Sequence, residues 1–198
     1  MGDRRVVLDL ETKKTFDEVG GREHIDQLGI SVVGIYDYEC SKYRTYEEKE
    51  LGQLQNFLID ASLIIGFNHI NFDFAVLQAY FSIDVETLPA FDILADFEKK
   101  AGHRIGLDSL AKATLNVGKT GHGLDAIRFY REGRMEELKS YCLNDVKVTR
   151  DIFEYGIENG KIFYFSKIGQ QKKEMAVDWK QYKKPKIVNL ASAQYKLF

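Results

Sequence analysis

The stretch Arg5-Val6-Val7-Leu8-Asp9-Leu10-Glu11-Thr12 is an apolar run that contains two acids, Asp9 and Glu11, near its end. The apolar run predicts a buried strand. Because successive strand side chains point to opposite faces, Asp9 and Glu11 share one face. Two carboxylates this close raise each other's pKa unless a positive charge lies between them, and a divalent metal ion is the simplest such charge. The alternative is a solvated strand end with two exposed acids.

The bulk composition predicts a single globular domain. The 198 residues are 44% hydrophobic and 29% charged, which is enough to bury a core. No apolar run approaches the ~18 residues of a membrane helix. The first residues lack an apolar leader, and Cys40 and Cys142 are too few for a disulfide framework, so we expect a cytoplasmic protein without membrane attachment.

The net charge of −2 hides a strong asymmetry between the two halves of the chain. Residues 1–98 hold 8 basic and 19 acidic residues, whereas residues 99–198 hold 20 basic and 11 acidic residues. Such a distribution suits a site where metal ions meet a polyanion. A mosaic of solvated faces explains the charges equally well.

The order of the predicted elements indicates an α/β fold with a central mixed five-stranded sheet, flanked by helices. Predicted strands cover 5–10, 28–36, 42–46, 63–67 and 91–94, and the segment 12–27 is predicted to be a long loop. Predicted helices cover 47–60, 70–81, 107–115, 125–130 and 135–155. Residues 162–165 and 175–179 predict a C-terminal hairpin extension. We therefore divide the chain into a domain of residues 1–160 and a hairpin with a basic tail, residues 161–198.

A second polar group, Asn68-His69-Ile70-Asn71-Phe72-Asp73, follows the apolar strand at 63–67. Ligands in open sheets gather beyond the carboxyl ends of adjacent strands, so Asp73 is expected near Asp9. The alternative is that Asp73 only stabilises a helix start, where a carboxylate is favoured.

A third group, Tyr141-Cys142-Leu143-Asn144-Asp145, lies on a predicted helix. Residues four apart share a helix face, so Tyr141 and Asp145 project together. This face continues to Val148 and Thr149, which suggests that it faces the core. The alternative is a partly buried Tyr–Asp hydrogen bond that stabilises the helix.

The three groups together, Asp-x-Glu, Asn-x-x-x-Phe-Asp and Tyr-x-x-x-Asp, resemble the DEDD exonucleases of the ribonuclease H-like superfamily. The resemblance covers Arg5 to Gly156. Tyr141 lies four residues before Asp145, and Ser140 stands where another branch has histidine, so the tyrosine branch is indicated. The match looks closest to predicted exonucleases that are related to polymerase-B proofreading domains and are often joined to helicases.

The resemblance implies a ribonuclease H-like fold and a metal-dependent 3′–5′ exonuclease that releases nucleoside monophosphates from single-stranded DNA or RNA. It implies that Asp9, Glu11, Asp73 and Asp145 hold two divalent ions, Mg²⁺ or Mn²⁺. Asp9 would bridge the ions, Glu11 would serve the ion that holds the attacking water, and Asp73 would serve the other. Tyr141 would orient that water. A helicase is the expected protein partner.

Several flanking residues are candidates for substrate contact: Leu10, Thr12, Asn68, His69, Phe72 and Lys119. Lys119 lies in Gly118-Lys119-Thr120, which resembles the end of a P-loop, but Ala113 stands where that motif needs glycine. A nucleoside triphosphate site is therefore rejected. The lysine-rich segment 172–186, with Trp179 and Tyr182, has the composition of a segment that binds single-stranded nucleic acid. The preferred interpretation is a solvated hairpin whose tryptophan packs in the core.

Two other functions remain as alternatives. One is a ribonuclease H-like module that binds nucleic acid or a helicase and cuts poorly, which would be marked by a lost carboxylate. The other is an endonuclease on the same fold. The Tyr-x-x-x-Asp pair, the last of the three groups along the chain, argues against an endonuclease. DNA and RNA stay open as substrates because no reader of the 2′-hydroxyl is visible in the sequence.

Overall fold

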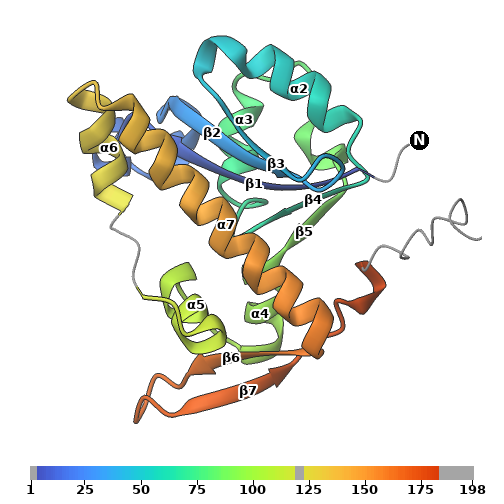
Figure 1. Ribbon diagram of the computed structural model, residues 1–198. Helices are drawn as coiled ribbons and strands as arrows, with labels where there is room; N and C mark the ends of the chain where they lie inside the picture. Colours follow the sequence, from blue (N-terminus) through green and yellow to red (C-terminus); the bar gives the residue numbers. More distant parts are fainter. Residues whose placement is uncertain (1–3, 119–122, 183–198) are drawn as a thin grey trace, which may run out of the picture.

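The computed structural model describes residues 4–118 and 123–182 and contains a five-stranded mixed sheet (Figure 1). The strands lie in the order β3-β2-β1-β4-β5. Their bounds are β1 Arg5–Thr12, β2 Ile30–Asp37, β3 Lys42–Tyr46, β4 Leu63–Gly66 and β5 Ala90–Asp92. β1 pairs antiparallel with β2 and parallel with β4, so the acidic strand is central. The predicted α/β fold with a mixed five-stranded sheet is confirmed.

Helices cover both faces of this sheet. They are α1 Phe16–Val19, α2 Leu51–Ile59, α3 Asp73–Gln78, α4 Ile93–Ala101, α5 Leu107–Leu115, α6 Gly123–Arg131 and α7 Met135–Asn159. Val6, Leu8 and Leu10 of β1 belong to a core with α2 and α3. Val7 belongs to a second core with α4, α5 and α7. In Figure 1, α7 runs diagonally across this second face, so the odd-numbered acids of β1 are directed toward it.

A two-stranded hairpin, β6 Lys161–Phe165 and β7 Lys172–Ala176, packs against the far end of α7 (Figure 1). The prediction that its second strand spans 175–179 was wrong, because Ile162 pairs with Met175 and the strand ends at Ala176. Trp179 follows the strand, is fully buried against Phe91 and Phe153, and donates a hydrogen bond from Nε1 to Asp96 Oδ2 at 2.8 Å. The apolar character of 177–179 therefore reflects tertiary packing rather than a strand.

Other boundaries also differ from the prediction. The segment 91–94 combines a short strand with the start of α4, whose buried face contains Ile93, Leu94 and Phe97. The loop predicted at 12–27 contains α1 and a 3-10 segment, Arg22–Gln27. α3 begins only at Asp73, and α7 continues beyond Gly156 to Asn159. No helix in 4–118 or 123–182 is both long enough and apolar enough to cross a membrane.

Gly156 is required where Trp179 packs on α7. A Cβ atom built at Gly156 would clash with the Trp179 ring. We expect Gly156→Ala to lower the free energy of unfolding by about 1–3 kcal/mol, because overpacking outweighs the gain in helix propensity. Gly52→Ala on α2 is the control, since a Cβ there meets nothing within 4 Å and should be neutral or stabilising. Urea unfolding of both variants measures the difference, and an unchanged Gly156→Ala midpoint would contradict the expected clash.

Candidate active site

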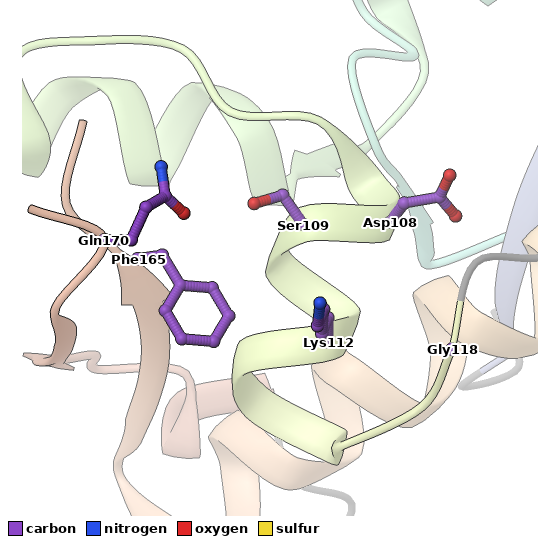
Figure 2. Close-up of a pocket in the computed structure, with 6 residues that line it drawn as sticks. All are labelled: Asp108, Ser109, Lys112, Gly118, Phe165 and Gln170. Carbon is purple, nitrogen blue, oxygen red and sulfur yellow. The ribbon is translucent and has the colours of Figure 1, made fainter.

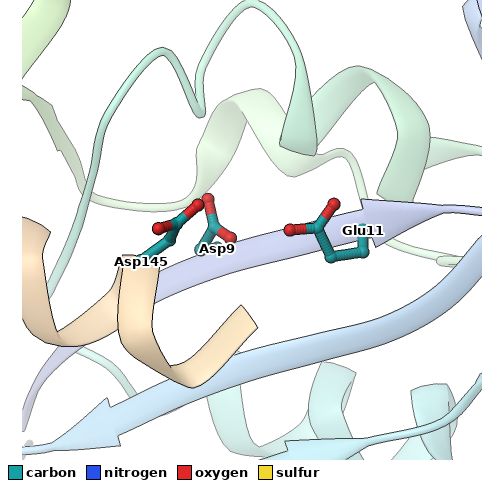
Figure 3. Close-up of side chains that lie close together, drawn as sticks. All are labelled: Asp9, Glu11 and Asp145. Atoms are coloured by element: carbon teal, nitrogen blue, oxygen red, sulfur yellow. The ribbon is translucent and has the colours of Figure 1, made fainter. Parts of the chain in front are cut away.

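Asp9 and Glu11 of β1 meet Asp145 of α7 in one acidic cluster (Figure 3). One carboxylate oxygen from each residue lies within 4.8 Å of the other two. The three side chains are partly buried between the strand and the helix. Residues 136 positions apart in the chain are thus brought to the separation of ligands around a common cation.

A glycine lets α7 come this close to the sheet. Gly34 of β2 lies directly opposite Asp9, and a Cβ there would lie 2.8 Å from Cys142 Sγ. The Cys142 thiol fills this space and lies 3.5 Å from the Asp9 carbonyl oxygen and 3.8 Å from Asp9 Oδ2. Gly34 and Cys142 therefore set the distance between the acids of β1 and Asp145, and neither residue belongs to a predicted motif position.

Asp73 lies beside this cluster but is not part of it. Its Oδ1 accepts a hydrogen bond from the Leu10 backbone N–H at 3.0 Å, and its side chain is almost fully buried. Burial raises its pKa to about 7, although the backbone amides of Asp73 and Leu10 act in the opposite direction. The charge of Asp73 raises the pKa of Asp9 in turn, which places the two carboxylates in electrostatic contact.

The electrostatics of the cluster fit a cation site. Burial raises the pKa of Asp9, and the charges of Asp73, Glu11 and Asp145 raise it further. Burial and the charges of Asp145 and Asp73 likewise raise the pKa of Glu11. Acids that repel each other in a partly dry site are stabilised as carboxylates by a divalent cation, and an all-oxygen donor set suits hard ions such as Mg²⁺ or Mn²⁺.

These raised pKa values predict how the metal-free protein responds to pH. Carboxyl groups with a higher pKa in the folded than in the unfolded state bind protons more tightly when folded. Their stabilising contribution is present at low pH and is lost as the pH rises from about 4 through about 7. We expect the metal-free Tm to fall by roughly 5 °C over this range and to recover on addition of excess Mg²⁺ or Mn²⁺. A Tm that rises with pH in EDTA would contradict this interpretation.

Tyr141 lies one helical turn before Asp145 and is half-buried. It packs with Val32, Leu138 and Cys142. Burial raises its pKa above the ordinary value, and the charge of Asp145 adds to the effect. The phenol therefore stays protonated at neutral pH, where its hydroxyl can donate or accept a hydrogen bond but is not a base.

The loop before Asp73 is held by Asp92, at the end of β5. Asp92 Oδ1 accepts from the N–H of Asn68 at 2.9 Å, and Oδ2 accepts from the N–H of Ile70 at 3.1 Å. Asp92 Oδ1 also caps α4 by accepting from the N–H groups of Leu94 and Ala95. Sequence reasoning did not identify Asp92 as part of the site. Its position after an apolar strand and before a helix, like that of Asp73, was the available signal.

The structure gives His69 a packing role. Its ring is fully buried over Gly66, stacks edge-to-face on Phe74 and places Nδ1 3.5 Å from Asp92 Oδ2. The ring is turned away from solvent, which gives no support to the predicted contact between His69 and a substrate. The preceding residue, Asn68, has a left-handed backbone (φ 66°), and its Oδ1 accepts a hydrogen bond from Arg104.

Other candidate substrate residues are less accessible than predicted. Leu10 is buried on the face of β1 opposite to the acids, and Thr12 is buried with its hydroxyl donating to the Lys14 carbonyl oxygen at 3.0 Å. Neither side chain is placed to contact a substrate at the carboxylates, because both are turned into the protein. Phe72 is partly exposed and packs edge-to-face on Phe16. Lys119 and the tail residues 183–198 lie outside the described residues.

Comparisons with known proteins agree with this geometry. A family model described as 3′-5′ exonuclease matches residues 4–155, which contain every predicted carboxylate and Tyr141. Among solved structures, the family B DNA polymerase from the hyperthermophilic archaeon Pyrobaculum calidifontis matches with a TM-score of 0.60 and 15% identity, over 79% of this chain and 25% of the polymerase chain. The present chain thus spans about a quarter of that polymerase chain, and the similarity between the two is one of fold alone. A search of curated proteins finds no match.

Proposed function

Because the chain belongs to the 3′-5′ exonuclease family, we propose that it removes nucleoside monophosphates from the 3′ end of single-stranded DNA or RNA. The proposal includes the tyrosine branch of these ribonuclease H-like enzymes. The observation that carries it is the convergence of Asp9, Glu11 and Asp145 within 4.8 Å, with Asp73 beside them. Carboxylates from separate elements, arranged around one point, are what a phosphodiesterase that uses divalent cations needs.

The proposed roles follow from the position of each side chain. Asp9 faces the other acids from the centre of the sheet and is the best-placed residue to bridge two cations. Glu11 and Asp145 flank it, whereas Asp73 has one oxygen engaged by the Leu10 amide and would reach a cation through its other oxygen or through water. Two bound cations would activate water and stabilise the charge on the attacking and leaving oxygens. The protonated Tyr141 hydroxyl would orient the attacking water.

A 5′-labelled single-stranded oligonucleotide, made as DNA and as RNA, tests the proposal. Each is incubated with the protein in EDTA, in Mg²⁺ and in Mn²⁺. We expect a ladder that shortens from the 3′ end in either metal, no product in EDTA, and mononucleotides as the released product. Longer fragments would indicate an endonuclease. No cleavage of either substrate would indicate a binding module.

Tyr141→Phe removes only the hydroxyl and should leave the packing against Val32 and Leu138 intact. We expect kcat to fall roughly 10- to 100-fold, because orientation of the water is lost while the carboxylates remain. KM and the unfolding midpoint should change little. Single-turnover cleavage in Mg²⁺ measures the effect, and a wild-type rate would mean that another group orients the water.

We further propose that residues 1–160 form the catalytic unit, with 161–198 as an extension of it, and that the chain acts beside a helicase. Such a partner would supply single-stranded ends. Purification of the chain from its own source, followed by identification of the proteins that accompany it, tests the association. A helicase is expected among them, and its absence would contradict the proposal.

A further inference from the structure

A cavity of about 560 Å³ lies between α5 and the β6–β7 hairpin (Figure 2). Among the described residues, its lining includes Asp108, Ser109, Lys112, Gly118, Phe165 and Gln170. In Figure 2 the Phe165 ring points toward α5 and Lys112, whereas Asp108 lies on the side away from the hairpin. The volume is within the roughly 300–1,000 Å³ typical of sites for organic ligands. One aromatic ring, one ammonium group, one carboxylate and two neutral polar side chains give it a mixed character.

The hairpin is fixed to α5, so the cavity has a defined shape. The Thr114 hydroxyl donates to the Phe163 carbonyl oxygen at 2.8 Å and accepts from the Phe163 N–H at 3.0 Å. Tyr164 packs inward against Phe97 with ring centroids 5.2 Å apart. Because strand side chains alternate, this contact turns Phe165 to the opposite face of β6, where the ring is partly exposed.

Among the described lining residues, Lys112 and Asp108 balance each other, and the excess of positive charge lies on the hairpin 161–176 beside the cavity. The exposed lysines Lys167, Lys172 and Lys173 lie at the tip of this hairpin, Lys172 opposite Phe165 and Lys173 opposite Tyr164 on the other face. Within the described part of the chain, Lys112, Lys167 and Lys173 form no ion pair with a carboxylate. A partly exposed aromatic ring that shares a cavity with an ammonium group is a combination that binds single-stranded nucleic acid, in which bases stack and phosphates pair with cations.

The cavity also adjoins the candidate active site. α5 and α7 share one core, in which Leu110 and Ala111 pack with Val146. The pKa of Tyr141 is raised by burial and by the site carboxylates, and the charge of Asp108 also contributes. Asp108 lies on the side of the cavity away from the hairpin, and Phe165 lies on the hairpin side (Figure 2).

We propose that this cavity binds the single strand upstream of its 3′ end, with a base stacked on Phe165 and a phosphate paired with Lys112. The inference rests on the proposed function, since the carboxylates would hold the terminal nucleotide. The lysines of the hairpin extend the contact to nucleotides further upstream. The hairpin thereby lengthens the substrate site beyond the ribonuclease H-like domain.

Substrate length separates this site from the carboxylates. KM and kcat are measured on a trinucleotide and on an oligonucleotide of about twelve nucleotides, as DNA and as RNA. We expect Phe165→Leu and Lys112→Ala each to raise KM roughly 10-fold on the longer substrate and to leave the trinucleotide unchanged. Phe165→Tyr keeps a ring and should behave as wild type. Lys42→Ala, an exposed lysine on β3 at the other edge of the sheet, is the charge control.

Binding is measured separately by fluorescence anisotropy of the longer oligonucleotides in EDTA, where no cleavage is expected. A loss of affinity in Phe165→Leu and Lys112→Ala, with a normal Lys42→Ala, supports the cavity even if the wild-type protein cuts nothing, a result that would overturn only the proposed function. Equal losses on the trinucleotide and the longer substrate, or no loss on either, would overturn the inference. The DNA and RNA arms show which sugar the cavity accepts.

Discussion

Asp9→Asn is expected to abolish phosphodiester cleavage, by more than roughly 1,000-fold, in a protein that folds normally. Burial raises the pKa of Asp9, and the charges of three acidic neighbours, Asp73, Glu11 and Asp145, raise it further. An amide at this position weakens cation binding at the centre of the site, where both proposed cations would lie. Cleavage is compared with wild type in saturating Mg²⁺ and Mn²⁺, so that a change in affinity is distinguished from a change in rate.

The same substitution should stabilise the metal-free protein. Asparagine removes one charge from a repelling cluster, and the Tm in EDTA at pH 8 should rise, by an amount equivalent to roughly 1–2 kcal/mol. Asp37→Asn is the matched control. Asp37 is a buried acid on β2 whose Oδ1 accepts the Glu39 N–H and whose Oδ2 accepts the Cys40 thiol, and asparagine has an oxygen for only one of them, so its replacement should lower stability and leave cleavage intact. Cleavage by Asp9→Asn at the wild-type rate would exclude the proposed site.

Asp92→Ala is expected to produce the largest loss of stability, about 3–5 kcal/mol, together with a fall in kcat. Asp92 accepts hydrogen bonds from four backbone amides, those of Asn68, Ile70, Leu94 and Ala95. Truncation leaves amides unsatisfied in a buried region and removes the N-cap of α4. The pKa of Asp92 lies below its usual range because the nearby His69 and the backbone amides outweigh the effect of burial.

A fall in kcat is expected because Asp92 holds the loop that leads to Asp73. Asn68 to Phe72 lead directly into Asp73, so a displaced loop moves Asp73 away from Asp9, and we expect kcat to fall roughly 10- to 100-fold. Asp92→Asn keeps one carbonyl oxygen for the Asn68 and α4 amides and should lie between Asp92→Ala and wild type. Denaturant unfolding and cleavage well below the Tm are measured on both variants. A destabilised Asp92→Ala with normal kcat would show that Asp73 is positioned independently.

The sheet was predictable because its strands are apolar runs separated by turn residues. Arg5 to Thr12 and Leu63 to Gly66 are typical of strands that are buried within a sheet, and Lys42 to Tyr46 matches its predicted bounds. α4 was missed because Phe91 to Leu94 is too short to distinguish a strand from the start of a helix. Asp92 as N-cap and Gly102 at the helix end were the local signals for it.

The acids of the site were predictable from spacing, since residues two apart on a strand and four apart on a helix share a face. The position of Asp73 near Asp9 was expected from strand ends that meet at one edge of a sheet, whereas the convergence of Asp145 with Asp9 and Glu11 was implied only by the resemblance. This convergence depends on Gly34 opposite Asp9 and on the Cys142 thiol that fills the space, which are contacts between segments distant in the sequence. The burial of Leu10, Thr12 and His69 could not be predicted for the same reason, because a motif gives the residue type and not the solvent exposure of its side chain.

The close approach of α7 to β2 at Gly34 has a consequence for the order of folding. Asp9 and Asp145 are separated by almost the whole matched domain, so the chain must close a very long loop before they meet. The three clustered acids therefore come together only when α7 has docked on β1, so we expect cations to act on the folded protein rather than on its folding. Cations in the medium would bind the finished protein and slow its unfolding, leaving the rate of folding to the chain alone.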